Sequence, residues 1–315
     1  TLTVRVDRIT RLTDDVTAFE LVHPAGRSLP AYTAGAHIDV HLPGGHTRTY
    51  SLARAPLGEG ADRYLIGVKR EARGRGGSFA LHQRVKEGDL LAIGSPRNAF
   101  ALSTDARHHL LLAGGIGVTP LLAMAQQLAH DGADFALCVF ARSREHLAFA
   151  QALSALGSKV RLHLDEPAEA PKIDLQALLG GAPSPGTHLY LCGPTGFMQA
   201  ALRAASLWPE SSIHREYFAP PQPAAEAEDR PFVLRLAGRG VEVMVQADQS
   251  AVDALHDLGI EVPTSCAQGV CGTCVVAWTA GEPEHRDHCL SATERLHKVA
   301  LCCARAKSAL LEVDL

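Results

Sequence analysis

Short apolar runs separated by turn residues fill the first hundred positions of the chain. Residues 1–7 alternate between polar and apolar side chains, and residues 37–42, 49–52 and 64–68 form similar short runs. Turn residues such as Pro43-Gly44-Gly45 separate the runs. Short strands at this spacing predict an antiparallel β-barrel, which we assign to residues 1–102.

From about residue 105 the pattern changes to apolar strands that alternate with helical stretches. The strand-like runs cover residues 109–113, 135–141, 160–164 and 188–191, and the helical stretches cover residues 121–128, 147–156 and 198–205. This alternation predicts a parallel sheet covered by helices, which is a Rossmann-like α/β domain over residues 103–225.

A third segment follows a stretch rich in proline and polar residues, 220–228, which has the composition of a semi-rigid linker. Residues 232–236 and 241–245 alternate around Gly238-Arg239-Gly240 and predict a hairpin. Ser250 is a suitable N-cap for a helix over residues 251–258, with Asp253 as an acid in its first turn. We assign linker and domain together to residues 226–315.

Composition narrows the function classes. A net charge of −4 favours neither nucleic acid nor an anionic membrane surface as a partner. The first residues lack the charged-then-apolar layout of a signal peptide. The longest apolar stretch, residues 110–122, is too short and too interrupted by glycine and proline to span a bilayer. These observations predict a cytoplasmic protein.

The eight cysteines are unevenly distributed, since five lie between Cys266 and Cys302 and Cys303 follows directly. In a reducing compartment such clustering indicates metal or redox chemistry. The run Cys266-x4-Cys271-x2-Cys274 has the spacing of a plant-type [2Fe–2S] cluster. Its glycines let the backbone pass close to a cluster, with N–H groups facing the sulfurs.

Other uses of these cysteines fit less well. A structural zinc site usually needs two separated pairs, a Rieske centre needs two histidines, and a thioredoxin-like dithiol begins a helix after a strand. The spacing leaves the fourth cluster ligand open between Cys289, Cys302 and Cys303.

Two strand ends in the α/β segment are suited to a dinucleotide. Residues 114–120, Gly114-Gly115-Ile116-Gly117-Val118-Thr119-Pro120, run from a strand through a glycine turn into a helix, whose N-terminus offers N–H groups to a pyrophosphate. Cys192-Gly193-Pro194 ends a second strand in the same way. The third glycine of the Rossmann fingerprint is missing, and a plain strand-to-helix turn explains either segment alone.

The barrel carries residues suited to a flavin. Arg48-Thr49-Tyr50-Ser51 supplies an arginine for a phosphate, an aromatic ring and a hydroxyl, with Arg48 and Tyr50 on one face of the strand. Residues 74–78, Gly74-Arg75-Gly76-Gly77-Ser78, precede a helix and offer a second anion nest. A surface arginine, a core tyrosine and a flexible loop explain the same residues equally well.

The three segments together resemble the phthalate dioxygenase reductase family, which includes the reductases of vanillate-type O-demethylases. The resemblance covers essentially the full length, in that family's order of flavin, NAD and ferredoxin domains. It implies a β-grasp fold for the plant-type ferredoxin domain, and FMN, NADH and a [2Fe–2S] cluster as cofactors. It also implies a monomer whose partner is a terminal Rieske-type oxygenase.

The resemblance also carries the family's site residues onto this chain. The implied flavin contacts are Arg48, Thr49, Tyr50, Ser51, Val68, Lys69, Gly76, Gly77 and Ser78. The implied nucleotide contacts are Gly114, Gly115, Gly117, Thr119, Pro120, Cys192, Gly193 and Pro194. Glu216-Tyr217-Phe218 resembles the family's E-x-F, so Phe218 would lie near the flavin and, with Ser51, form the expected catalytic pair.

The end of the chain resembles the family's C-x-x-R-A-K-S, with Arg305 three residues after Cys302. The resemblance therefore implies that Cys302 completes the metal ligand set Cys266, Cys271, Cys274 and Cys302. On that interpretation Cys138, Cys192, Cys289 and Cys303 are small apolar residues. The residue at Cys303 departs from the usual one in the family.

The expected reaction moves a hydride from NADH to the flavin and then single electrons through the cluster to the partner. Because the cofactors carry this chemistry, no side chain need act as acid or base, and most of the 16 histidines are assigned to the surface. Arg142 and Ser143 follow the second strand of the NAD domain, where an arginine can accept a 2′-phosphate and no acid rejects NADPH. NADH remains the expected donor.

Two other functions compete with this interpretation. One is an iron–sulfur redox sensor without turnover, which would need no hydride-donor site. The other is a reductase that serves a separate ferredoxin or a cytochrome P450.

Overall fold

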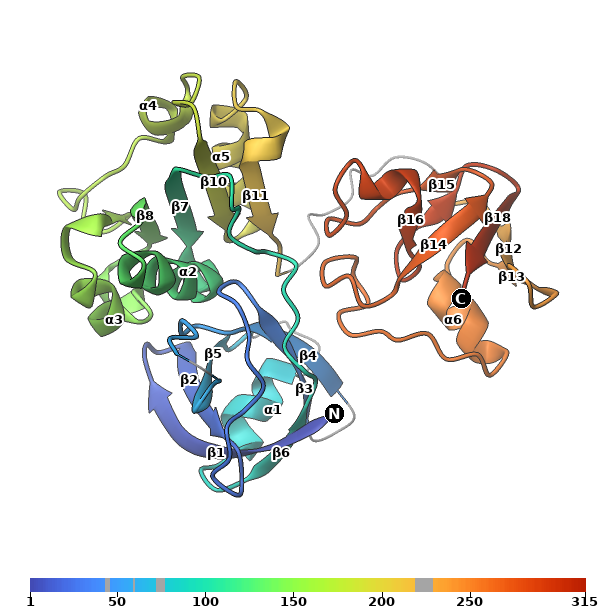
Figure 1. Ribbon diagram of the computed structural model, residues 1–315, viewed down its shortest axis with the longest axis horizontal. Helices are drawn as coiled ribbons and strands as arrows, with labels where there is room; N and C mark the ends of the chain where they lie inside the picture. The colour runs from blue at the N-terminus through green and yellow to red at the C-terminus, as the bar shows by residue number, and fades with distance from the viewer. Residues whose placement is uncertain (43–45, 59, 72–76, 219–228) are drawn as a thin grey trace. The chain divides into compact units, whose positions relative to one another are not determined.

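A computed structural model describes residues 1–42, 46–58, 60–71, 77–218 and 229–315. It divides into two compact units, Thr1–Glu216 and Tyr217–Leu315, each of which is described by itself (Figure 1). The predicted turn 43–45, residues 74–76 of the predicted anion nest and the predicted linker 220–228 lie outside the described residues. No helix in the described ranges combines the length and the apolarity that crossing a membrane requires.

The first unit begins with the predicted antiparallel barrel. Its strands, in the order β4-β3-β6-β1-β2-β5, are β1 (Leu2–Arg11), β2 (Val16–Val22), β3 (His37–Leu42), β4 (His46–Ser51), β5 (Arg63–Lys69) and β6 (Leu90–Ile93). An antiparallel bridge between Leu52 and Ile66 joins the two outer strands and closes the sheet. Helix α1 (Gly77–Arg84) buries Leu81 in the barrel core. Closure leaves few unpaired strand edges, and the predicted barrel is confirmed.

The second half of this unit is a parallel sheet in the order β11-β10-β7-β8-β9. Its strands are β7 (His108–Gly114), β8 (Asp134–Ala141), β9 (Val160–Leu164), β10 (Thr187–Cys192) and β11 (Ile213–Glu216). Its helices are α2 (Val118–His130), α3 (Ala150–Ala155), α4 (Leu175–Leu179) and α5 (Thr195–Ala204), with 3₁₀ turns at Gly115–Gly117, Arg144–His146, Gly157–Lys159 and Glu210–Ser212. The chain adds β8 and β9 on one side of β7 and then returns to add β10 and β11 on the other side. The strand order therefore reverses between β7 and β10. Ligands of open α/β sheets bind at the carboxyl ends of strands beside such a reversal.

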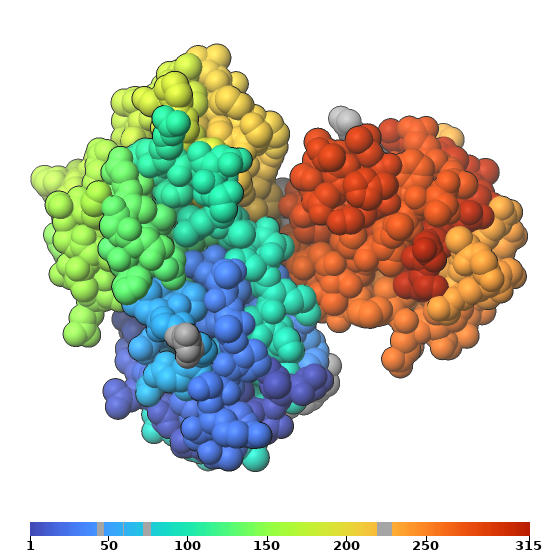
Figure 2. Space-filling view, in the orientation of Figure 1, coloured from blue at the N-terminus to red at the C-terminus, as the bar shows by residue number. Residues whose placement is uncertain are grey.

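Barrel and sheet share one hydrophobic core. Val16, Ala18 and Ala53 of the barrel are buried in the same cluster as Met124 of α2. The backbone N–H of Ala55 also donates to the Gln126 side chain over 2.9 Å. Figure 2 shows barrel atoms, blue to cyan, against green α/β atoms on the face in view. This shared core fixes the position of the barrel relative to the parallel sheet within the first unit.

One predicted helix is shorter than expected. The pattern predicted a helix over residues 147–156, but α3 spans Ala150–Ala155 because Phe149 has a left-handed backbone with φ of +59°. The Phe149 ring fills the space beside Gly67 of β5, where an added Cβ would lie 2.9 Å from it. The buried ring contact therefore replaces the first helical turn.

The second unit is a mixed five-stranded sheet in the order β13-β12-β18-β14-β16. Its strands are β12 (Phe232–Leu236), β13 (Val241–Val245), β14 (Val275–Ala280), β16 (Lys298–Ala300) and β18 (Leu310–Asp314). A separate pair, β15 (Pro283–Glu284) and β17 (Arg305–Ala306), and a 3₁₀ turn at Glu294–Leu296 complete it. Helix α6 (Ala251–Asp257) begins with the predicted cap, since the side chains of Ser250 and Asp253 form a capping box.

The turns after β7 and β10 approach each other too closely for side chains. Gly117→Ala should lower the free energy of unfolding by about 1–3 kcal/mol in urea denaturation, because the added Cβ would lie 2.3 Å from the Cys192 carbonyl oxygen. Gly196→Ala in α5 is the matched control, because nothing lies within 4 Å of its added Cβ and alanine favours a helix. Equal stability of the two variants would contradict this packing.

Candidate functional site

The barrel residues predicted to bind a flavin lie on β4 and beside the start of α1. Arg48 and Gly77 come together, since a Cβ on Gly77 would lie 2.6 Å from Arg48 Cγ. The Thr49 hydroxyl donates to Asp39 Oδ1 over 2.9 Å, so it supports the strand pair β3–β4. Tyr50 packs against the barrel core, and burial raises the pKa of its phenol, which therefore stays neutral.

The other predicted flavin contacts lie on or near β5. Val68 is fully buried in the barrel core, and its carbonyl lies 3.0 Å from His82 Nε2. Lys69 pairs with Glu71 at the exposed end of the strand. Ser78 accepts a hydrogen bond from the Glu71 N–H over 3.1 Å. Gly76 lies outside the described residues.

A hydrogen bond links the barrel to the edge strand of the parallel sheet. Ser51, at the end of β4, donates from Oγ to Glu216 Oε2 over 2.9 Å, across 165 positions of sequence. The Glu216 side chain is only 13% exposed, and burial raises the pKa of its carboxyl to about 7. Within the first unit, the predicted catalytic hydroxyl thus faces a carboxyl that is partly protonated near neutral pH.

His37 stands beside this pair. Its Nδ1 lies 4.0 Å from Glu216 Oε1, and neither ring nitrogen has a hydrogen-bond partner within the described residues. Burial, and then the Arg97 charge, lower the pKa of His37 to about 4, so the ring is neutral at neutral pH. His37 and His109 are the buried exceptions to the expected surface placement of histidines. The alternating pattern of β3 alone does not distinguish a buried histidine at position 37 from one on the surface.

The predicted nucleotide turns meet at the reversal of strand order. A Cβ on Gly193 would lie 3.0 Å from the Gly114 backbone, so neither turn has room for a side chain. Gly115 has a positive φ of 52°, and the Thr119 hydroxyl donates to the Ile116 carbonyl over 3.1 Å. Pro120 and Thr119 lie in the first turn of α2, as predicted. The site therefore exposes backbone, which suits close approach of a pyrophosphate.

Cys192 and Pro194 end the second turn. Cys192 is fully buried, and burial, followed by the nearby Glu216 charge, raises the pKa of its thiol. Pro194 directly precedes α5. Cys138 is fully buried as well, so both cysteines fill the core as small residues.

Arg142 and Ser143 lie beside a cavity of about 720 Å³ that Ser143, Arg144, His146, Glu166 and Glu169 help to line. Ser143 Oγ is 2.8 Å from His146 Nδ1, and Arg142 Nε is 4.0 Å from Glu166 Oε1. The sequence places no acid directly after β8, where Arg142-Ser143-Arg144 follow. Glu166 comes instead from the segment after β9, which pattern analysis of β8 alone does not reach.

In the second unit, the four predicted cluster ligands converge. The Cys302 thiol interacts with the thiols of Cys266 and Cys274, and Cys271 interacts with Cys266. Three backbone N–H groups point at sulfurs: Cys266 to Cys271 at 3.5 Å, Gln268 to Cys266 at 3.3 Å and Gly269 to Cys302 at 3.2 Å. Donors aimed at sulfur suit thiolates bound to iron.

The loop around these thiols has the backbone that the spacing predicted. Gly269 and Gly272 have positive φ values of 71° and 74°, and Ala267 has a φ of 52°. In the described part of the chain, no three His, Cys, Asp or Glu side chains are spaced to hold a single metal ion.

Two further cysteines lie near these four. Cys303 Sγ donates to the Ala300 carbonyl over 3.8 Å. Burial, with the charges of Asp287 and the neighbouring thiols, raises the pKa of Cys289 to about 12. Arg305 fixes the chain after Cys302, since its guanidinium donates to the carbonyls of residues 230, 246 and 249 and stacks on Phe232.

Phe218, the second predicted catalytic residue, belongs to the second unit and is 42% exposed. Tyr217, which precedes it, packs against His288 with ring centroids 4.9 Å apart.

Comparison with protein families gives two matches. A family described as a 2Fe-2S iron-sulfur cluster binding domain matches residues 234–307. The N-terminal domain of the DmmA-like subunit of dimethylamine monooxygenase matches residues 95–210.

Two curated relatives match almost end to end. The reductase subunit of a tert-butanol monooxygenase / tert-amyl alcohol desaturase from Aquincola tertiaricarbonis is 43% identical, over 100% of this chain and 96% of the relative. A vanillate O-demethylase oxidoreductase from Pseudomonas sp. strain HR199 is also 43% identical, over 96% of each.

Two solved structures have the same fold over the whole chain. Phthalate dioxygenase reductase, described as a modular structure for electron transfer from pyridine nucleotides to [2Fe–2S], aligns with a TM-score of 0.72 and 36% identity over 100% of this chain and 98% of that one. An intact type IV self-sufficient cytochrome P450 monooxygenase aligns with a TM-score of 0.89 and 34% identity, and this chain spans 41% of its length.

The raised pKa of Glu216 predicts a pH dependence of stability. The carboxyl has a reference pKa of 4.5 and a folded value of about 7, so folding favours its protonated form. This contribution is fully present below about pH 4.5 and is lost as the pH rises through about 7. Relative to Glu216→Gln, the wild-type chain should lose about 2–3 kcal/mol of unfolding free energy between about pH 5 and about pH 8 in urea titrations. A pH-independent difference would place the carboxyl pKa in its usual range.

Proposed function

This chain belongs to the phthalate dioxygenase reductase family, and we propose that it is the reductase component of a two-component Rieske oxygenase or O-demethylase. It is an oxidoreductase that passes electrons from NADH through FMN to a [2Fe–2S] cluster and on to the oxygenase. The full-length identity of 43% to a vanillate O-demethylase oxidoreductase is the observation that carries this conclusion. The converging thiols and the paired glycine turns support it from the structure.

The proposed cluster ligands are Cys266, Cys271, Cys274 and Cys302. Cys302 is preferred to Cys303 because it receives the Gly269 N–H and interacts with two other ligand thiols, whereas Cys303 donates to a carbonyl. Three backbone N–H groups stabilise negative charge on the sulfurs, which favours the reduced state.

The proposed flavin site comprises Arg48 to Ser51, Val68, Lys69 and Gly76 to Ser78, with FMN as the flavin. Bound flavin would accept a hydride and release single electrons. The protein positions it: Arg48 beside the start of α1 suits a phosphate, and Tyr50 offers a ring. Ser51 holds its hydroxyl proton on Glu216, and Phe218 is the second proposed catalytic position.

The proposed nucleotide site comprises the turns Gly114 to Pro120 and Cys192 to Pro194, with Arg142 and Ser143 at the ribose end. NADH is the proposed donor. Glu166 partly neutralises the Arg142 charge through their ion pair. Glu166 and Glu169 in the adjoining cavity would repel a 2′-phosphate.

Three finer proposals complete the assignment. The flavin, NAD and ferredoxin domains span residues 1–102, 103–225 and 226–315. The reductase acts as a monomer between encounters with its oxygenase. It works in the cytoplasm, whose reducing conditions keep ligand thiols available.

A cytochrome P450 is the second candidate partner. The alignment with a self-sufficient P450 at a TM-score of 0.89 favours it, because a reductase of this fold occurs there within one chain. Pull-down with the separately expressed oxygenase and P450 candidates, followed by NADH-driven turnover, decides between the partners. A redox sensor would show no sustained NADH-dependent reduction of cytochrome c.

Loss of a cluster ligand should separate the two halves of the reaction. Cys271→Ser should abolish the cluster absorption and NADH-driven reduction of cytochrome c, yet leave NADH-to-dye activity, because the dye takes electrons from the flavin. Cys289→Ser is the matched control, since Cys289 lies beside the ligand thiols but outside the proposed set. Loss of dye activity in Cys271→Ser would contradict the order of electron transfer.

Removal of the proposed phosphate ligand should weaken flavin binding. Arg48→Ala should lower FMN affinity about 10–100-fold, since a hydrogen bond to a charged group contributes about 1.5–3 kcal/mol. Fluorescence titration of the deflavinated protein measures this affinity. Arg8→Ala, an exposed arginine on β1, should bind FMN as the wild type does. Wild-type affinity in Arg48→Ala would remove Arg48 from the site.

A further inference from the structure

The backbone of Gly269 joins the cluster loop to a second segment of the same unit. Its N–H donates to Cys302 Sγ over 3.2 Å, and its carbonyl accepts from the His288 N–H over 2.8 Å. A Cβ on Gly269 would lie 2.5 Å from Cys303 Sγ and 3.0 Å from the Asp287 backbone. The orientation of the Gly269 backbone, and with it the N–H that reaches Cys302, therefore depends on where residues 287 and 288 are held.

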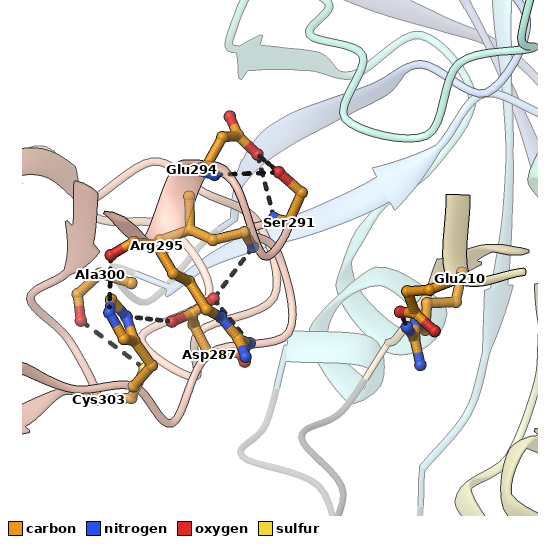
Figure 3. A network of polar contacts seen from close by, with 10 residues as sticks. Glu210, Asp287, Ser291, Glu294, Arg295, Ala300 and Cys303 are labelled. Atoms are coloured by element: carbon orange, nitrogen blue, oxygen red, sulfur yellow. Dashed lines mark hydrogen bonds and ion pairs between the residues drawn. The ribbon is translucent and has the colours of Figure 1, made fainter. Parts of the chain in front are cut away.

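Asp287 holds that turn from inside the unit. Its side chain has no exposed surface, and its Oδ2 accepts from the Leu290 N–H over 3.0 Å. Arg295 Nη2 donates to the Asp287 carbonyl over 2.5 Å and lies 3.4 Å from Oδ2. Figure 3 shows the side chains of Asp287 and Arg295 pointing toward one another. A buried carboxylate with a cationic partner fixes local backbone geometry, because separating the two would leave a charge unpaired.

The partners of Asp287 are anchored to the sheet. His285 Nδ1 lies 3.4 Å from Asp287 Oδ1, and its Nε2 lies 3.1 Å from the Arg295 carbonyl. The Trp278 indole N–H donates to the same carbonyl over 3.2 Å. Trp278 belongs to β14, the strand that begins directly after Cys274. We call His285, Asp287 and Arg295 the Asp287 triad.

We propose that Asp287 is a positioning residue for the iron–sulfur cluster: through the Asp287 triad it keeps the Gly269 N–H on Cys302 Sγ and so raises the reduction potential of the cluster. The inference rests on the proposed function, since it requires a cluster bound by Cys302. An amide aimed at a ligand sulfur stabilises the extra negative charge of the reduced cluster. Asp287 is not a cluster ligand, so the ligand set alone does not predict this dependence.

Asp287→Asn gives a test in which two effects have opposite signs. Removal of a buried anion near the cluster raises its potential by electrostatics alone. Loss of the Gly269 hydrogen bond lowers it. Spectroelectrochemistry of the holoenzyme should show a negative shift, with an equilibrium constant for reduction about tenfold lower, equivalent to about 59 mV for a one-electron couple. An unchanged or raised potential, with the cluster intact by its visible and EPR spectra, would overturn the proposal.

Glu294→Gln is the matched control. Glu294 lies on the same segment and also loses one negative charge, but its side chain is 40% exposed and bonds to Ser291 and Lys298 (Figure 3). Its potential should stay at the wild-type value or rise slightly. A fall equal to that of Asp287→Asn would assign the effect to general loosening of the segment and contradict a specific role for Asp287.

A charge-neutral variant covers the case in which Asp287→Asn assembles no cluster. Trp278→Phe removes one donor to the Arg295 carbonyl without a change of charge, and it should lower the potential in the same direction by a smaller factor. Exchangeable-proton coupling in the EPR spectrum of the reduced cluster should weaken with it. Unchanged potential and coupling in Trp278→Phe would overturn the proposal. A wild-type chain without any cluster would instead refute the proposed function.

Discussion

The hydrogen bond from Ser51 to Glu216 is the constraint on which the first unit depends. It joins the end of a barrel strand to the last residue of the sheet's edge strand, 165 positions apart. Glu216 pairs with Cys192 in the sheet, and Cys192 opposes Gly117 at the reversal of strand order. The proposed flavin and nucleotide sites therefore share one boundary, as direct transfer of a hydride between two bound molecules requires. The shared hydrophobic core holds that boundary in place.

The second unit meets a different requirement. Single electrons pass from donor to acceptor without the transfer of an atom, so the two need no shared pocket. What the chain supplies there is backbone: N–H groups at 3.2–3.5 Å from the sulfurs and a loop that passes through positive φ at Gly269 and Gly272. Residues outside the ligand set then determine how firmly those groups are aimed. The Asp287 triad and Arg305 both act in this way, one on the cluster loop and one on the chain after Cys302.

The sequence predicted the barrel, the parallel sheet and the hairpin because each depends on local periodicity. The ligand spacing Cys266-x4-Cys271-x2-Cys274 is likewise local. Long-range contacts were not accessible in this way: Glu166 reaches Arg142 from the segment after β9, and His37 of β3 is buried beside Glu216 of β11, which belongs to a different sheet. Helix α3 was predicted too long for the same reason, since Phe149 packs against Gly67 of the barrel.

An anaerobic visible spectrum of the purified protein before and after addition of NADH, with chromatography of the released flavin, tests the central claim most directly. The account predicts flavin bands and a broad cluster absorption, both bleached by NADH, and FMN as the released flavin. A protein that remains colourless, or that NADH does not bleach, after reconstitution with iron, sulfide and FMN would contradict it.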